Sequence, residues 1–209
     1  MLNQAKGPIW HRKQQKKGIV PEGLRGLDRE ATWGYGRSDG WIYGHGSFCM
    51  VSHEKRFLGM FKWMPNSKDE SKWLWWEAAK LKGLVSKVCM DARADKTRLF
   101  YEMKRQHGMT LLTRRQQKKG KKQIPGREAM YKEIYRKENV AIYKKRSTTV
   151  EPMQGLVKDI FELDRCWMRG VKANRWLFAA MGVAVQMAQW KALDENSSTW
   201  AIKREVIGL

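Results

Sequence analysis

Apolar and polar residues near the start of the chain follow a pattern that predicts a β-hairpin. Residues 41–53 and 57–64 are rich in aromatic and branched side chains, which favour strands. The sequence Ser-His-Glu-Lys-Arg that joins them is typical of a turn, so antiparallel pairing is expected. Gly44 and Gly46 indicate a bulge or a close backbone approach within the first of the two strands.

A helix is expected over residues 69–82. Ser67 and Glu70 fit a capping box at its start, and Gly83 fits its end. The tryptophans of this helix suit packing better than stacking on bases, because buried aromatic rings are the commoner case. They are Trp73, Trp75 and Trp76.

A short apolar strand is expected over residues 85–90, and it ends on Asp91. A helix over 96–106 and a strand over 109–113 follow it. Ligands and catalytic groups of α/β sheets lie where strands end at their carboxyl side, so Asp91 is a candidate site residue. The alternative is that Asp91 is only a turn residue that introduces the next helix.

The second half of the chain is expected to be mostly helical. A polar helix over 127–139 leads into a short strand over 140–143. Residues 174–190 are apolar nearly all round, with several small side chains, and predict a helix buried in the core. The tail, residues 193–209, is expected to be frayed.

Between these segments, a helix is expected to begin near Pro152, a residue suited to a first turn. Apolar residues at helical spacing give it one buried side; they are Val150, Met153, Val157, Ile160 and Phe161. Glu151 and Lys158, nearly two turns apart, share one line on its polar flank. An alternative role for Glu151 is a capping box with Thr148.

Residues 1–40 contain many glycines and predict a loop-rich lead-in. The glycines at 34, 36 and 40 superficially resemble a nucleotide-binding fingerprint, but no strand is expected before them and no helix after them. Nucleotide binding is therefore not expected here.

The charge of the chain points to a polyanion as partner. It has 42 lysines and arginines against 21 acidic residues, a formal net charge of +21. Nucleic acid is the first expected partner and an anionic membrane the second. The longest apolar run, residues 176–185, is too short to span a bilayer, so membrane residence is not expected. Basic runs at 12–17 and 114–122 fit either solvated loops or phosphate contacts.

The three cysteines are widely spaced in apolar surroundings, which favours buried free thiols over a metal or redox site. They are Cys49, Cys89 and Cys166. The first residues contain no apolar signal core, so a cytoplasmic location is expected.

One spacing of reactive side chains resembles a known family. Tyr143, Arg146, Glu151 and Lys158 are similar to the tyrosine, arginine, glutamate and lysine signature of bacterial insertion-sequence transposases of the DDE type. The family pattern usually has three residues between arginine and glutamate, whereas this chain has four. Further likeness covers most of the chain; it includes residues 6–11, 40–45, 88–91 and the helix after Gly170.

The resemblance implies a ribonuclease H-like mixed sheet flanked by helices, in the α/β class. It implies a lead-in over 1–40, a catalytic domain over 41–192 with a basic insertion at 114–142, and a tail over 193–209. Asp91 and Glu151 match two of three acids that hold two Mg²⁺ ions for phosphodiester cleavage and strand transfer. Tyr143, Arg146 and Lys158 match residues that bind DNA phosphates.

The third acid of the resembling family is an aspartate on the opening strand, just before the segment that resembles residues 2–11. That aspartate and strand are absent here, and Asp28 and Asp39 lie in loop-like sequence that makes them poor substitutes. We therefore expect a catalytically incomplete portion of a transposase. It should bind double-stranded DNA, as a homodimer in the bacterial nucleoid, and catalyse little strand transfer. Two alternatives remain open: a non-catalytic DNA-binding remnant and an RNA-binding accessory protein.

Overall fold

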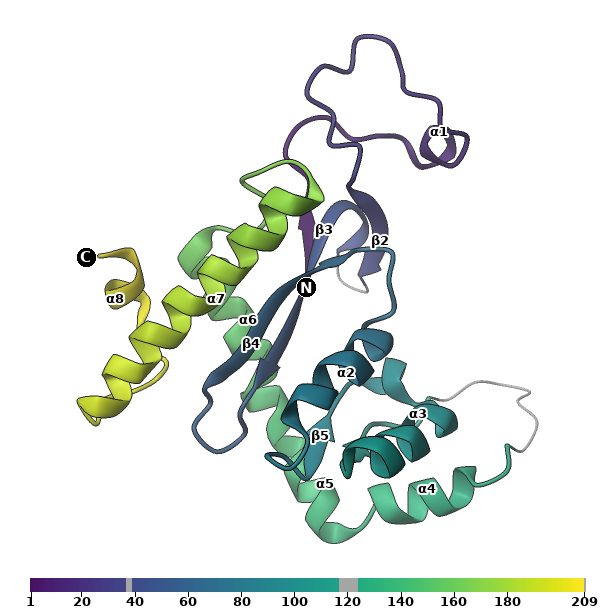
Figure 1. Ribbon diagram of the computed structural model, residues 1–209, viewed down its shortest axis with the longest axis vertical. Helices are drawn as coiled ribbons and strands as arrows, with labels where there is room; N and C mark the ends of the chain where they lie inside the picture. The colour runs from purple at the N-terminus through teal and green to yellow at the C-terminus, as the bar shows by residue number, and fades with distance from the viewer. Residues whose placement is uncertain (37–38, 117–123, 209) are drawn as a thin grey trace. The chain divides into compact units, whose positions relative to one another are not determined.

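The computed structural model describes residues 1–36, 39–116 and 124–208 (Figure 1). The chain divides into two compact units. Unit 1 comprises Met1–Lys68 and Thr148–Leu209, and unit 2 comprises Asp69–Ser147. Helices and strands are mixed along the chain, which confirms the expected combination of α and β structure. The domain boundaries expected from the sequence stay a prediction.

Unit 1 contains a four-stranded antiparallel sheet built around β3 (Gly40–Val51). β3 pairs with β1 (Leu2–Gln4), β2 (Thr32–Gly36) and β4 (Leu58–Pro65). The β3–β4 pair is the hairpin expected from the sequence. β2 and β4 follow one another along one edge of β3, because residues 44–46 of β3 pair with β1 as well as with these two strands.

The lead-in is rich in loops, as expected, but it also contains short regular elements. Besides β1 and β2 it contains a short helix, α1 (Arg12–Lys16), which carries most of the basic run at 12–17. The Trp10 indole donates to the Ile19 carbonyl at 2.8 Å, and the Trp33 indole donates to the Trp10 carbonyl at 2.9 Å. A small core surrounds these rings: Ala5, Trp10, Ala31 and Tyr43, with Val20, Leu27 and Trp33 packed against it.

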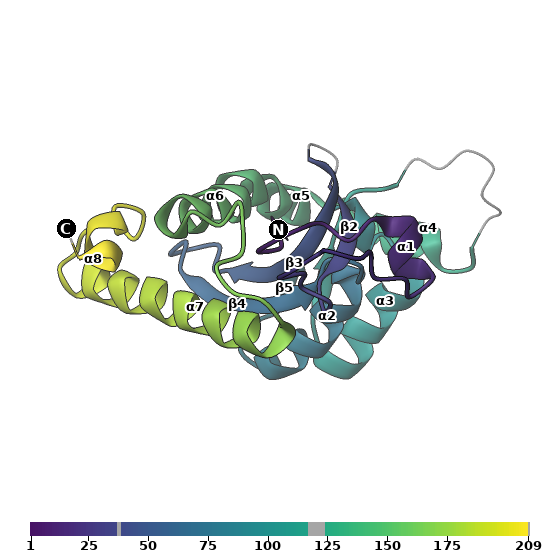
Figure 2. The same ribbon diagram turned by 90° about the horizontal axis from the view of Figure 1, so that it is seen from above.

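The main core of unit 1 lies between the β3–β4 hairpin and three helices. These are α6 (Val150–Phe161), α7 (Val171–Asp194) and α8 (Lys203–Ile207), and α7 packs along β4 (Figures 1 and 2). The buried side chains of this core are Leu58, Phe61, Trp63, Met153, Val157, Ile160, Leu163, Cys166, Leu177, Phe178, Met181, Val185, Ala188, Ala192 and Ile202. The apolar side expected for α6 is therefore confirmed.

Two expectations for the C-terminal part are wrong. The tail is not frayed, because Ile202 is fully buried and the Thr199 hydroxyl donates to the Lys55 carbonyl at 3.0 Å. The helix α7 is not buried all round. One side faces the core, while Trp176 and Met187 on the other side are 69% and 67% exposed.

Unit 1 also buries a polar network that the sequence did not reveal. Asp28, expected to be a loop residue, is 2% exposed and lies after β1. Its Oδ2 is 2.8 Å from His45 Nε2 and accepts from the Gly170 amide at 2.8 Å. His45 Nδ1 accepts from the Trp63 indole at 2.9 Å, so Nε2 carries the proton that is donated to Asp28.

The acid–base behaviour of Asp28 gives the first prediction. Burial alone would raise the pKa of Asp28, but the hydrogen bonds from His45 and Gly170 outweigh burial and lower it. A lowered folded-state pKa contributes stability above the unfolded value of about 4, and this contribution is lost as the pH falls through the folded value. We expect Asp28→Asn to destabilise the protein by about 1–3 kcal/mol at pH 7.

The difference between the wild type and Asp28→Asn should shrink as the pH falls below about 4, since the wild-type carboxylate is then protonated as well. Urea unfolding at a series of pH values measures it. A difference that stays constant between neutral and acidic pH would contradict an ionised Asp28 in the folded state.

Unit 2 contains a parallel pair of strands surrounded by short helices. In chain order its elements are α2 (Glu70–Ala78), η1 (Ala79–Leu81), β5 (Lys87–Cys89), η2 (Ala92–Ala94), α3 (Thr97–Glu102), η3 (Met103–His107), β6 (Thr110–Leu112), α4 (Arg127–Ile134), α5 (Lys137–Lys144) and η4 (Lys145–Thr148). The strands expected over 85–90 and 109–113 are confirmed as β5 and β6, and they pair in parallel.

Two local expectations for unit 2 are wrong. The cap of α2 is Asp69, whose Oδ1 accepts from the Ser71 amide at 3.0 Å, and not Ser67. The strand expected over 140–143 is part of α5. Four apolar residues are too few to impose a strand when charged residues favoured by the helix dipole, Glu138 in the first turn and Lys144 in the last, flank them.

Candidate nucleic-acid interface

The candidate site in unit 2 forms at the carboxyl end of the parallel pair. β5 and β6 run in the same direction, so the residues that follow them meet at one edge. The Thr113 hydroxyl donates to the Asp91 carbonyl at 2.7 Å and ties the two strand ends together. Asp91 Oδ1 accepts from the Arg93 amide at 3.0 Å and caps η2, as the turn-residue alternative predicted.

Three of the residues singled out in the sequence come together here. Burial raises the pKa of Tyr143, the charges of Arg146 and Arg114 oppose this, and the charge of Asp91 adds to it. Arg146 also forms a hydrogen bond with the Tyr143 side chain. The site therefore combines two guanidinium groups, a neutral phenol and one carboxylate within the same unit.

Arg114 was missed as a member of this site and was assigned only to a basic run. It follows the strand expected over 109–113 by one residue. Functional groups of α/β sheets lie just after the carboxyl ends of strands, and this rule, which singled out Asp91, applies equally to Arg114. What the sequence lacked was the pairing of the two strands, which brings their ends side by side.

Cys89, the last residue of β5, also feels the charge of Arg146. Burial raises the pKa of Cys89 to about 11, while the charges of Arg146 and Lys87 lower it. Arg146 therefore lies near β5 as well as near Tyr143. All three cysteines are free thiols, but only Cys166 is buried as expected, while Cys49 and Cys89 are partly buried.

Asp95 fixes the segment that carries Arg114. Its side chain is buried, and Oδ2 accepts from the Gln116 amide at 2.7 Å and from Arg127 at 2.6 Å. The Tyr131 hydroxyl lies 2.9 Å from both carboxylate oxygens. Asp95 thus holds the chain on both sides of the basic run, of which residues 117–122 lie outside the described part.

Positive charge is concentrated in unit 2. Its 79 residues contain 22 lysines and arginines against 9 acidic residues, a net charge of +13 out of the total of +21. The rest of the chain, with 130 residues, carries the remaining +8. The unit that contains the arginine cluster is therefore the main source of positive electrostatic potential.

The other two signature residues lie on α6 in unit 1. Glu151 is exposed in the first turn, and Lys158 Nζ is 3.5 Å from Asp164. The N-cap of α6 is Thr149 and not Thr148, and Thr149 makes no side-chain capping bond. Glu151 and Asp91 belong to different units, each of which the structure describes by itself.

The metal site that the resemblance implies stays a prediction. Among residues 1–36, 39–116 and 124–208, no group of three or more histidine, cysteine, aspartate or glutamate side chains could hold a metal ion. Asp91 is engaged in capping η2.

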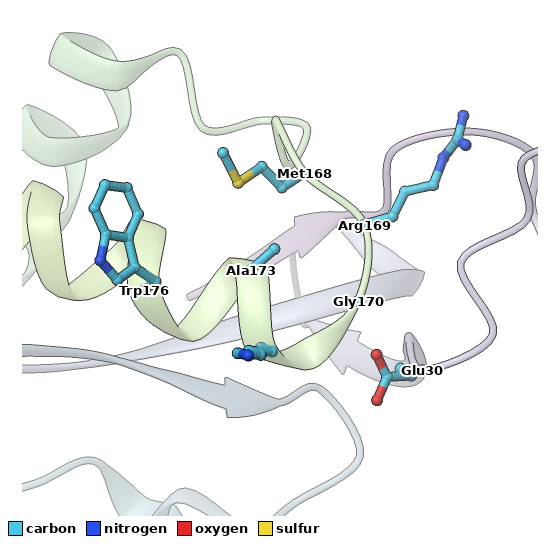
Figure 3. A pocket seen from close by; sticks show the side chains of 7 residues that line it. Glu30, Met168, Arg169, Gly170, Ala173 and Trp176 are labelled. Carbon is cyan, nitrogen blue, oxygen red and sulfur yellow. The ribbon is translucent and has the colours of Figure 1, made fainter.

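A separate hollow in unit 1, with a volume of about 440 Å³, lies beside the start of α7 (Figure 3). Its lining residues are Glu30, Met168, Arg169, Gly170, Lys172, Ala173 and Trp176. The amide of Val171 donates to Glu30 at 2.9 Å, and that of Gly170 donates to Asp28. Acidic side chains therefore already occupy the helix end where an anion would bind.

Comparisons with models of protein families, with curated proteins and with solved structures found no match. No helix in the described part of the chain is both long and apolar enough to cross a membrane.

Proposed function

We propose that this chain is a DNA-binding portion of a DDE-type insertion-sequence transposase with a ribonuclease H-like architecture. The observation that carries the proposal is the cluster of Arg114, Arg146 and Tyr143 beside Asp91 at the carboxyl edge of a parallel strand pair. This is the edge at which α/β sheets place their ligands. Arg146, Arg114 and Asp91 each act on the pKa of Tyr143, so two signature residues and the acid that the same resemblance singled out influence one another.

The chemistry of the cluster suits a sugar-phosphate backbone. Guanidinium groups bind phosphate oxygens by paired, charge-assisted hydrogen bonds. The raised pKa of Tyr143 keeps its hydroxyl protonated at neutral pH, so it can donate to a phosphate oxygen. The net charge of +13 on unit 2 attracts the polyanion from a distance and makes binding dependent on salt.

A non-catalytic DNA-binding protein is the second candidate. It is favoured by the capping role of Asp91 and by the lack of a three-ligand group among the described residues. The DNA that encodes the chain separates the candidates: an in-frame Asp-Ser-Thr sequence upstream, with terminal inverted repeats around the gene, supports the transposase, and the failure of both to appear supports the second candidate. Only the transposase candidate implies Mg²⁺ as a cofactor.

We expect the purified chain to bind duplex DNA with a steep dependence on salt. Fluorescence anisotropy over a series of salt concentrations should give a slope of log K against log salt of about −3 or steeper, as for three or more neutralised phosphates. Competition with single-stranded DNA and structured RNA tests the partner. Tighter binding of RNA than of duplex DNA, or no binding of duplex at low salt, would contradict the proposal.

A further inference from the structure

The outward side of α7 carries a continuous line of apolar side chains. Trp176, Val183, Met187 and Trp190 are 69%, 52%, 67% and 63% exposed. Together with the partly buried Ala180, they are spaced by four, three, four and three residues, the spacing of a helix–helix seam. Single exposed apolar residues are common, but a line with two tryptophans is typical of an interaction surface.

The two tryptophans of the line and the charges beyond them are placed symmetrically about Val183. Trp176 and Trp190 are each seven residues from it, and Lys172 and Asp194 are each eleven residues from it. At a rise of about 1.5 Å per residue these positions lie about 10 Å and about 16 Å from Val183 on either side. An antiparallel copy of α7 centred on Val183 would therefore place tryptophan against tryptophan and lysine against aspartate.

The charges at the two ends are not explained by the stability of α7 itself. A helix dipole favours acidic residues in the first turn and basic residues in the last. α7 has Lys172 and no acidic residue in its first turn, and its last turn contains Asp194, its last residue, together with the basic Lys191. The side chains of Lys172 and Asp194 are exposed. Their arrangement is unfavourable within one helix and favourable between two antiparallel helices.

We propose that this chain forms a two-fold homodimer through antiparallel pairing of α7 around Val183. The line from Trp176 to Trp190 is about 21 Å long, so helix pairing alone gives an interface at the small end of the range for specific complexes. The dimer therefore forms reversibly, in a manner that depends on concentration. The second copy is the occupant because the tryptophans and the end charges are placed symmetrically about Val183, as a self-complementary surface requires.

Sedimentation velocity of the full chain without nucleic acid tests the proposal independently of the proposed function. The wild type should pass from monomer to dimer between low and high micromolar concentration. Val183→Glu places two carboxylates at the two-fold axis and should weaken the dimer at least tenfold. Ala129→Glu, on an exposed position of α4, is the matched control and should leave dimerisation unchanged.

Exchange of the end charges tests the antiparallel direction. Lys172→Asp and Asp194→Lys should each weaken the dimer several-fold, and the double variant should restore it. In a parallel pair each residue would face its own copy, and the double exchange would restore nothing. A chain that stays monomeric at all concentrations, or a dimer unaffected by Val183→Glu, would overturn the proposal.

A cysteine variant covers the case in which Val183→Glu does not fold. Oxidation of Val183→Cys should join two copies by a disulfide across the axis, visible on a non-reducing gel. Ala129→Cys should remain uncrosslinked under the same conditions. If Val183→Cys behaves like this control, α7 does not pair around Val183.

Discussion

Replacement of Gly44 by alanine is expected to destabilise the protein by about 3 kcal/mol, at the upper end of the range for overpacked positions. Gly44 lies in β3, where it pairs with Gln4 of β1 and Thr32 of β2. A Cβ atom at Gly44 would overlap the carbonyl oxygen of Asn3, which is backbone and cannot rotate away. The added methyl group must therefore push β1 off the sheet.

Displacement of β1 would also release a second contact. The Gln4 amide donates to the Asp164 carbonyl at 3.0 Å, and the Cys166 amide donates to the Gln4 carbonyl at 2.7 Å. β1 thus joins β3 to the segment between α6 and α7. Urea denaturation monitored by tryptophan fluorescence measures the loss of stability.

Gly155→Ala is the matched control for Gly44→Ala. Gly155 lies inside α6, and a Cβ atom added there meets nothing within 4 Å. Alanine should stabilise this helix position by about 0.5–1 kcal/mol, because glycine loses more backbone entropy in a helix. Equal effects of the two substitutions would contradict the close approach of β1 and β3.

The hairpin and the strand that leads to Asp91 were predictable because their signals are local. Aromatic and branched residues on either side of a turn-like sequence predicted the β3–β4 pair. Of the two features that the glycines of β3 indicated, a bulge or a close backbone approach, Gly44 makes the close approach. The apolar residues of α6 likewise gave the buried side of that helix. In each case neighbouring residues carry the whole signal.

The features that could not be predicted depend on residues far apart in the sequence. β1 has three residues and gains its place only by pairing with β3. Asp28 reads as a loop residue until His45 and Gly170 are placed beside it. The sequence of α7 has apolar residues on nearly all sides, so the exposed line cannot be told from the buried side by composition alone.

Reversal of the two arginines of the candidate site is expected to give the largest effect on DNA binding. Arg114→Glu with Arg146→Glu should weaken binding of duplex DNA about 100-fold at moderate salt and make the slope of log K against log salt shallower by about 2, since each lost phosphate contact accounts for about 0.9. Anisotropy titrations of wild type and variant over the same salt series measure both quantities. Circular dichroism establishes that the variant is folded.

The control must separate contact from overall charge. Lys55→Glu with Arg204→Glu changes the net charge by the same amount at two exposed positions of unit 1. The net charge falls by four in both double variants, so an effect that depends only on the total charge of the protein would be the same in both. Only the Arg114 and Arg146 variant also loses direct phosphate contacts, so its slope must change more. Equal slopes for the two variants would mean that DNA is held by the general charge of the protein, and Arg114 and Arg146 would have no special role.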